Sequence, residues 1–151
     1  MKSLLIPVLL MLFSACNSVD NASNEAIFTN AEGAINGIDP VAYFTESKPV
    51  KGQADITFDW QNATWHFATK ENLDLFSKNP ENYAPQFGGY CAYGWSDGEG
   101  HAAPTEPQAW AIVDGKLYLN YNLDVQKMWK EKQAELIQKA NKNYGTAYSN
   151  N

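Results

Sequence analysis

The apolar residues of this chain alternate with polar ones in two places, and each pattern predicts a β-hairpin. Residues 55–60 and 64–68 alternate on either side of a short turn, with the aromatic residues of the return strand on one face and His66 on the other. A second alternating pair lies within residues 110–121. It flanks Asp114-Gly115, a dipeptide that favours the type I′ turn of a tight hairpin.

Capping residues and helical periodicity predict a helix after each hairpin. Thr69 is a suitable N-cap for a helix over residues 70–78. Residues 124–142 carry an apolar stripe with lysines opposite it, which predicts one continuous helix. Asp39-Pro40 places a capping carboxylate before a proline and predicts a helical turn at residues 41–44. This order indicates a small α+β domain with two hairpins, a short central helix and a long C-terminal helix.

The first residues are typical of an export signal. Residues 1–15 join a lysine to a short apolar stretch, and the four residues ending at Cys16 resemble a bacterial lipobox. We expect lipidation of Cys16 to anchor the protein to a membrane of the bacterial cell envelope, facing the periplasm or the exterior. The alternative is an ordinary secretory signal with an incidental cysteine. Residues 16–33 predict a polar tether, residues 34–144 the folded domain and residues 145–151 a disordered tail.

The charge of the chain argues against nucleic acid as a partner. Its formal net charge is −6 at pH 7, and all eleven basic residues are lysines. An acidic surface without arginine is a poor phosphate binder, whereas its field favours cations. No phosphate-binding loop, dinucleotide fingerprint or nucleophile elbow is present, so no organic cofactor is indicated.

Cys91 is the first functional candidate. If Cys16 is lipidated it cannot pair with Cys91, which leaves a lone thiol outside the cytoplasm, where cysteines mostly form disulfides. Cys91 lies within the glycine-rich stretch of residues 88–94, which opens an irregular segment over residues 88–107. Glycines permit tight turns and the close approach of a ligand, and long ordered loops are frequently functional. The alternative is a buried, inert cysteine.

The two histidines are the candidate partners of this thiol. His66 lies within a predicted strand, and His101 lies in the irregular segment. A thiolate with one or two imidazoles suits copper, and zinc less specifically. The sequence therefore predicts Cys91, His66 and His101 as metal ligands. The plain alternatives are a structural role for His66 and a solvated loop position for His101.

Short stretches between residues 39 and 83 resemble the YHS domain family, whose metal-associated members handle copper or sense heavy metals. The stretches are Asp39-Pro40-Val41, Phe67-Ala68-Thr69, Phe76, Pro80 and Tyr83. In those members, cysteines follow the Asp-Pro-Val stretch and flank the start of the helix. This chain has Ala42, Ala68 and Asn72 at those positions. The resemblance therefore implies a metal-associated family without its usual thiolate set.

A closer resemblance is to exported YHS-domain proteins with the stretch Gly-Gly-Tyr-Cys-Ala-Tyr-Gly and a Val-Asp-Gly-Lys-Leu-Tyr-Leu-Asn-Tyr hairpin. Both stretches stand here, at residues 88–94 and 113–121. Some members of that group are selenoproteins with selenocysteine at the position of Cys91. Selenocysteine serves nucleophilic, redox or soft-metal chemistry, so the resemblance implies a functional Cys91.

Three functions remain open from the sequence. The first is a membrane-tethered protein that binds a soft metal ion, copper before zinc, with a metal-transfer protein as its partner. The second is a thiol oxidoreductase in which Cys91 reacts with peroxides or disulfides and an external thiol restores it. The third is a metal-free binding module in which Tyr90, Tyr93 and Trp95 line a pocket for a small ligand or a protein. The sequence favours a binding protein over an enzyme.

Overall fold

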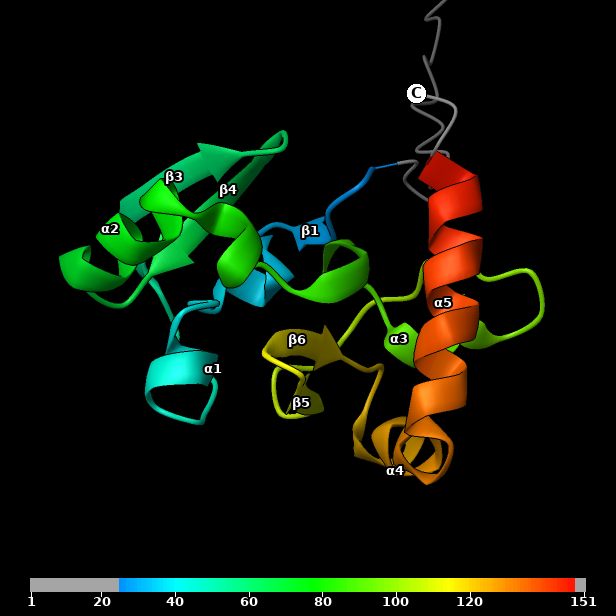
Figure 1. Ribbon diagram of the computed structural model, residues 1–151. Helices are drawn as coiled ribbons and strands as arrows, with labels where there is room; N and C mark the ends of the chain where they lie inside the picture. The colour runs from blue at the N-terminus through cyan, green and yellow to red at the C-terminus, as the bar shows by residue number, and fades with distance from the viewer. Residues whose placement is uncertain (1–24, 149–151) are drawn as a thin grey trace, which may run out of the picture.

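The computed structural model of the protein describes residues 25–148, which form mixed α and β structure (Figure 1). The α+β class predicted from the sequence is confirmed. The predicted signal over residues 1–15 and the lipidation site at Cys16 lie outside the described residues. Between residues 25 and 148, no helix is long and apolar enough to cross a membrane.

The strands form three separate antiparallel hairpins rather than one sheet. They are β1 (Thr29–Asn30) with β2 (Gly33–Ala34), β3 (Gln53–Trp60) with β4 (Ala63–Phe67), and β5 (Trp110–Val113) with β6 (Lys116–Leu119). The second and third are the hairpins that alternation predicts. The first was not expected. Because Ile27 is buried just before it, the fold includes residues that their composition assigned to the tether.

The turn of each predicted hairpin has the backbone that its residues require. Gln61 and Asn62 have φ of 51° and 58°, and Asp114-Gly115 has φ of 51° and 73°. Two successive positive φ values are the signature of a type I′ turn, whose twist matches that of the paired strands. In β4 this pairing directs the aromatic side chains into the core, while His66 faces the other side and is only partly buried.

Five helices and three single 3-10 turns complete the described fold. The helices are α1 (Ala42–Thr45), α2 (Lys70–Lys78), α3 (Ala92–Ser96), α4 (Leu123–Glu131) and α5 (Gln133–Tyr148), and the turns are η1 (Ile35–Gly37), η2 (Pro80–Asn82) and η3 (Gln86–Gly89). The bounds of α2 agree with the prediction, and the hydroxyl of Thr69 accepts the amide of Asn72 at 3.1 Å as its cap.

The predicted long C-terminal helix is present, but its predicted bounds are wrong, because residues 124–142 belong to two helices. The helix breaks at Lys132, where φ is −132°, and resumes as α5 through Tyr148. The break turns the chain so that Trp129 of α4 and Ala140 of α5 are both fully buried in the same core. Helical periodicity continues across Lys132 and therefore does not reveal the break. The irregular segment after residue 88 likewise contains a short helix, α3.

Two apolar cores lie side by side, separated by the β5–β6 hairpin. In Figure 1 β3, β4 and α2, which contribute to the first core, lie at the left, and α3, α4 and α5, which contribute to the second, lie at the right. Leu117 and Leu119 belong to the first core, and Tyr118 between them belongs to the second. Because successive side chains of a strand point to opposite faces, β6 serves both cores at once.

The buried carboxylate of Asp39 joins the elements of the first core. Its Oδ1 accepts the amides of Val41 and Ala42 at 2.9 and 3.4 Å, which stabilises the turn that leads into α1. Its Oδ2 accepts the amide of Ala68 at 2.8 Å and Nδ2 of Asn72 at 2.7 Å. A side chain with no exposed surface thus connects α1, the end of β4 and the start of α2.

We expect Asp39→Asn to destabilise the fold by about 3 kcal/mol or more, because an amide –NH₂ would replace one oxygen and face buried N–H donors. The free energy of unfolding in a urea titration measures the loss. Asp74→Asn, which changes an exposed carboxylate on α2, is the matched control and should shift stability by less than about 0.5 kcal/mol. Equal effects of the two substitutions would contradict the central role of Asp39.

Candidate functional site

A strained turn presents Cys91 at the start of α3. In η3, Phe87 and Gly88 have φ of 57° and 64°. Gly88 admits no side chain, since a Cβ there would lie 1.7 Å from the carbonyl oxygen of Ala26. The chain then extends through Tyr90 and enters α3 with Cys91 as its N-cap. The first glycines of the motif therefore serve the turn that positions the thiol.

Two main-chain donors and one side-chain acceptor surround the sulfur of Cys91. The amides of Gly94 and Tyr121 donate to Sγ at N···S distances of 3.4 and 3.2 Å. The thiol itself lies 3.8 Å from Oδ1 of Asn120, to which it donates. Because N–H donors stabilise a negative charge better than a neutral sulfur, this arrangement favours the thiolate.

Burial acts in the opposite direction. Cys91 is 2 % exposed and is the free cysteine among residues 25–148. Desolvation raises the pKa of its thiol above the ordinary value, and the amides of Gly94, Tyr121 and Tyr93 offset only part of this rise. The thiol is therefore protonated at neutral pH. A ligand that displaces the proton binds a thiolate to which the amides of Gly94 and Tyr121 already donate.

Main-chain pairing holds the segment of His101, whose side chain is exposed, beside the segment that begins with Cys91. The amide of Cys91 donates to the carbonyl oxygen of Ala103 at 3.0 Å, and the amide of His101 donates to that of Gly94 at 3.1 Å. The two segments thus run antiparallel. A Cβ on Gly94 would lie 3.4 Å from Nε2 of His101, so the missing side chain leaves room for the imidazole. The amide of Gly94 thus donates to the sulfur, and the open space on its Cα faces the ring of His101.

His66 lies in a different part of the molecule. A Cβ on Gly33 would lie 2.8 Å from Nε2 of His66, and a Cβ on Gly52 would lie 2.5 Å from Cβ of His66. Its Nδ1 lies 3.2 Å from the carbonyl oxygen of Gln53, which favours the proton on Nδ1. The ring lines a surface pocket together with Lys51. The contacts that position His66 are therefore those of the β3–β4 hairpin and β2.

The three predicted ligands do not form one group in the described part of the chain. There, no three His, Cys, Asp or Glu side chains lie close enough to share a metal ion. The described side chains therefore do not form a closed site with four such ligands, which structural zinc requires. The main-chain pairing brings the segments of Cys91 and His101 together, and that the two residues are ligands stays a prediction. That His66 is a ligand stays a prediction.

Asn120 is the residue of this site that sequence reasoning missed. It is fully buried, and its Oδ1 accepts the amide of Tyr93 at 3.2 Å while facing the thiol of Cys91. Its Nδ2 has no hydrogen-bond partner, which costs about 1–3 kcal/mol in a buried amide. Its position directly after β6 could have identified it, because the alternation of side chains along a strand places residue 120 on the same inward face as Tyr118.

The three aromatic residues predicted to line a ligand pocket have different surroundings. Tyr90 and Trp95 are 4 % and 5 % exposed and pack in the second core. Tyr93 is half-buried and lines a surface pocket with Met128 of α4 and Lys139 of α5. Their role in binding a ligand stays a prediction.

The three positions at which the resemblance to metal-associated YHS domains would place cysteines meet at Asp39. The amides of Ala42 and Ala68 and the side chain of Asn72 all donate to its carboxylate. Hydrogen-bonded groups thus replace the thiolates that would hold a metal ion there. A metal held in the manner of those relatives does not fit this part of the fold.

A model of the YHS domain family matches residues 41–87. The matched segment contains α1, the β3–β4 hairpin and α2, and it ends before Cys91. No curated protein and no solved structure matches the chain. The match is consistent with a metal-binding role. The surroundings of Cys91 lie beyond it.

We expect the native thiol of Cys91 to react with iodoacetamide at least about tenfold more slowly at pH 8 than the same thiol in concentrated urea, because burial limits access and its pKa is raised. The raised pKa also moves the midpoint of the rate–pH profile above that of the unfolded chain. The measurement uses a Cys16→Ser background, in which Cys91 is the sole thiol. A native midpoint below the unfolded one would contradict the dominance of desolvation.

Proposed function

We propose that this protein binds a soft metal ion, Cu(I), through the thiolate of Cys91 and the imidazole of His101. The observation that supports the proposal most directly is the main-chain pairing of these segments, in which the amide of Gly94 donates to the sulfur and the missing side chain of Gly94 leaves room for the ring of His101. Thiolate and imidazole favour copper over the hard cations that carboxylates bind. Two protein ligands leave coordination positions open, as a carrier needs in order to pass its ion to a partner.

The protonation of the thiol is part of this proposal. Cys91 must lose its proton when the ion binds, so affinity rises with pH up to the raised pKa of the thiol. The amides of Gly94 and Tyr121 then donate to a thiolate, and hydrogen bonds to a charged acceptor are roughly twice as strong as neutral ones. These donors also fix the direction of the sulfur lone pairs.

The location of the protein belongs to the same proposal. We place it at the bacterial cell envelope, tethered through a lipidated Cys16 and facing the periplasm or the exterior. The match of residues 41–87 to the YHS domain supports a metal-binding role in general terms. The net charge of −6 supports a cationic cargo, because an acidic surface raises the local concentration of cations.

Reversible oxidation of Cys91 is a second candidate. It is favoured by the N–H donors around Sγ and by the buried Nδ2 of Asn120, which lacks an acceptor. The thiolate would attack the O–O bond of a hydroperoxide to give a sulfenic acid and an alcohol or water. An external thiol would then restore it through a mixed disulfide. The raised pKa weighs against this candidate, because the thiolate is the nucleophile.

Anaerobic Cu(I) titration against a chromophoric chelator tests the metal proposal, with the full chain in a Cys16→Ser background. We expect one bound ion, its loss in Cys91→Ala, and affinity weakened at least about tenfold in His101→Ala. His66→Ala should leave the affinity unchanged, because its ring packs against Gly33 and Gly52. Equal binding by Cys91→Ala would overturn the proposal, and equal losses in both histidine variants would add His66 to the site.

A glycine pair supplies a matched control for the position of His101. Gly94→Ala places a Cβ 3.1 Å from the carbonyl oxygen and 3.4 Å from Nε2 of His101, and it should weaken Cu(I) binding. Gly145→Ala on α5 adds the same methyl group where nothing lies within 4 Å, and it should leave binding unchanged.

Absence of Cu(I) binding, together with sulfenic acid trapped by dimedone after peroxide treatment, would favour the redox candidate.

A further inference from the structure

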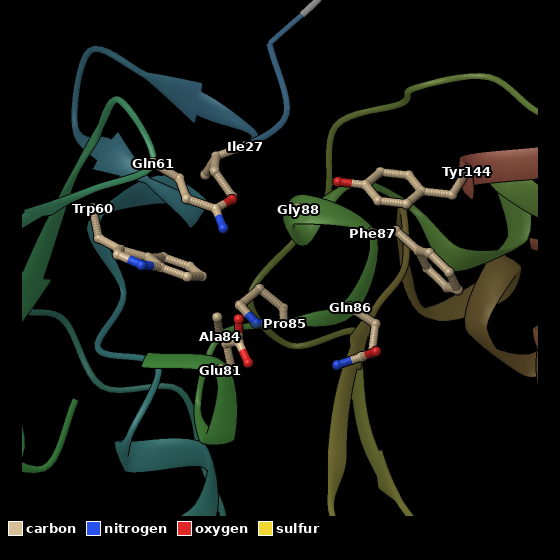
Figure 2. Close-up of a pocket in the computed structure, with 10 residues that line it drawn as sticks. All are labelled: Ile27, Trp60, Gln61, Glu81, Ala84, Pro85, Gln86, Phe87, Gly88 and Tyr144. Atoms are coloured by element: carbon tan, nitrogen blue, oxygen red, sulfur yellow. The ribbon is translucent and has the colours of Figure 1, made fainter. Parts of the chain in front are cut away.

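A pocket of about 360 Å³ opens between the two cores, and Cys91, His66 and His101 are not among its lining residues. The end of β3, the segment over residues 81–88 and helix α5 form its walls. Figure 2 shows the rings of Trp60 and Tyr144 on opposite sides of the pocket, with Gly88 between them. The proposed metal function does not use this pocket.

The lining carries one negative charge and no positive one. Glu81 is its charged residue and forms no ion pair among residues 25–148. The other polar side chains are the carboxamides of Gln61 and Gln86 and the phenol of Tyr144. Tyr144 donates its hydroxyl to the carbonyl oxygen of Ala26 at 3.1 Å, and burial raises its pKa to about 12, so it remains neutral. A cation is therefore the complementary charge.

Trp60 supplies an aromatic surface to the same pocket. Its ring packs against Trp65 and Phe76 at centroid distances of 5.9 and 5.7 Å, which fixes its orientation. In Figure 2 the indole extends from the strand end toward Pro85 and the centre of the pocket. An indole attracts a cation through its π-electron face more strongly than the other aromatic side chains do. Ile27, Ala84 and Pro85 add apolar contacts for the body of a ligand.

The wall of the pocket at Phe87 and Gly88 is held in a rare conformation. Both residues have positive φ, and the carbonyl oxygen of Gly88 accepts the amide of Phe28 at 2.8 Å. A left-handed conformation costs a residue such as phenylalanine of the order of 1–3 kcal/mol, and it persists where the surroundings fix it. The ring of Phe87 packs against Tyr118 at 5.9 Å in the second core and anchors this turn. The pocket is thus formed before any ligand binds.

We propose that this pocket binds a small organic cation, a protonated or quaternary amine with an apolar substituent. The carboxylate of Glu81 supplies the opposite charge, and the indole of Trp60 supplies the aromatic face. The carboxamide oxygens of Gln61 and Gln86 accept hydrogen bonds where the ligand has N–H groups. The acidic surface of the protein draws such a cation toward the pocket.

An NMR titration of the isotope-labelled full chain with benzyltrimethylammonium tests the proposal. We expect saturable shifts of the Trp60 indole N–H and of the amides of Gln61 and Gly88. Glu81→Gln should weaken binding about fivefold, the size expected for an exposed ion pair. The control is Glu71→Gln, which neutralises an exposed carboxylate on α2 that does not line the pocket. It should leave the dissociation constant unchanged.

Two further ligands separate charge recognition from simple apolar contact. Benzyl alcohol keeps the ring without the charge, and phenylacetate reverses the charge, so both should bind at least about fivefold more weakly than the ammonium ion. Added salt should weaken binding of the ammonium ion alone. Shifts that do not saturate, equal binding of the three ligands, or an unchanged dissociation constant in Glu81→Gln would each overturn the proposal.

Discussion

The hydrogen bonds of one buried carboxylate, that of Asp39, set the arrangement on which the rest of the fold depends. A carboxylate with no exposed surface is tolerated only where donors replace its water, and here four N–H groups do so. Those donors come from three separate elements, α1, the end of β4 and the start of α2. None of these elements can shift without leaving a buried donor or acceptor unpaired, so together they fix the first core.

The same network separates this chain from the metal-associated members of the YHS family. Ala42, Ala68 and Asn72 stand where those members carry cysteines, and all three donate to Asp39. The soft-ligand chemistry of the described residues therefore centres on Cys91, next to the second core. Hairpin β5–β6 connects the two regions, because its Leu117 and Leu119 pack in the first core while Asn120, just beyond it, contacts the thiol. The geometry at Cys91 thus depends on a core that contains none of its ligands.

Local signals in the sequence were sufficient for the elements whose causes are local. Thr69 identified the start of α2, and Asp114-Gly115 identified a turn, because a cap or a positive φ depends on the residue itself. The break at Lys132 was not predictable, since only the joint burial of α4 and α5 requires it. The pairing of the His101 segment with that of Cys91 was also hidden from sequence spacing. It consists of main-chain hydrogen bonds between the start of α3 and an irregular segment, which side-chain identity does not encode.

The thiol of Cys91 is covered by the surrounding structure. Cys91 is 2 % exposed, so exchange of an ion with its sulfur requires a neighbouring segment to move. The segment that carries His101 is held by main-chain hydrogen bonds to Cys91 and Gly94 and by side-chain hydrogen bonds on either side of it, from Asn143 to Gly98 and from Thr105 to Gly89. Displacing α3 instead would disrupt the second core. Gly98 and Gly100, both at positive φ, precede His101 and give that segment its turns. His101 is exposed and is not part of the second core, so in the proposed carrier its segment can move to release the ion without disrupting that core.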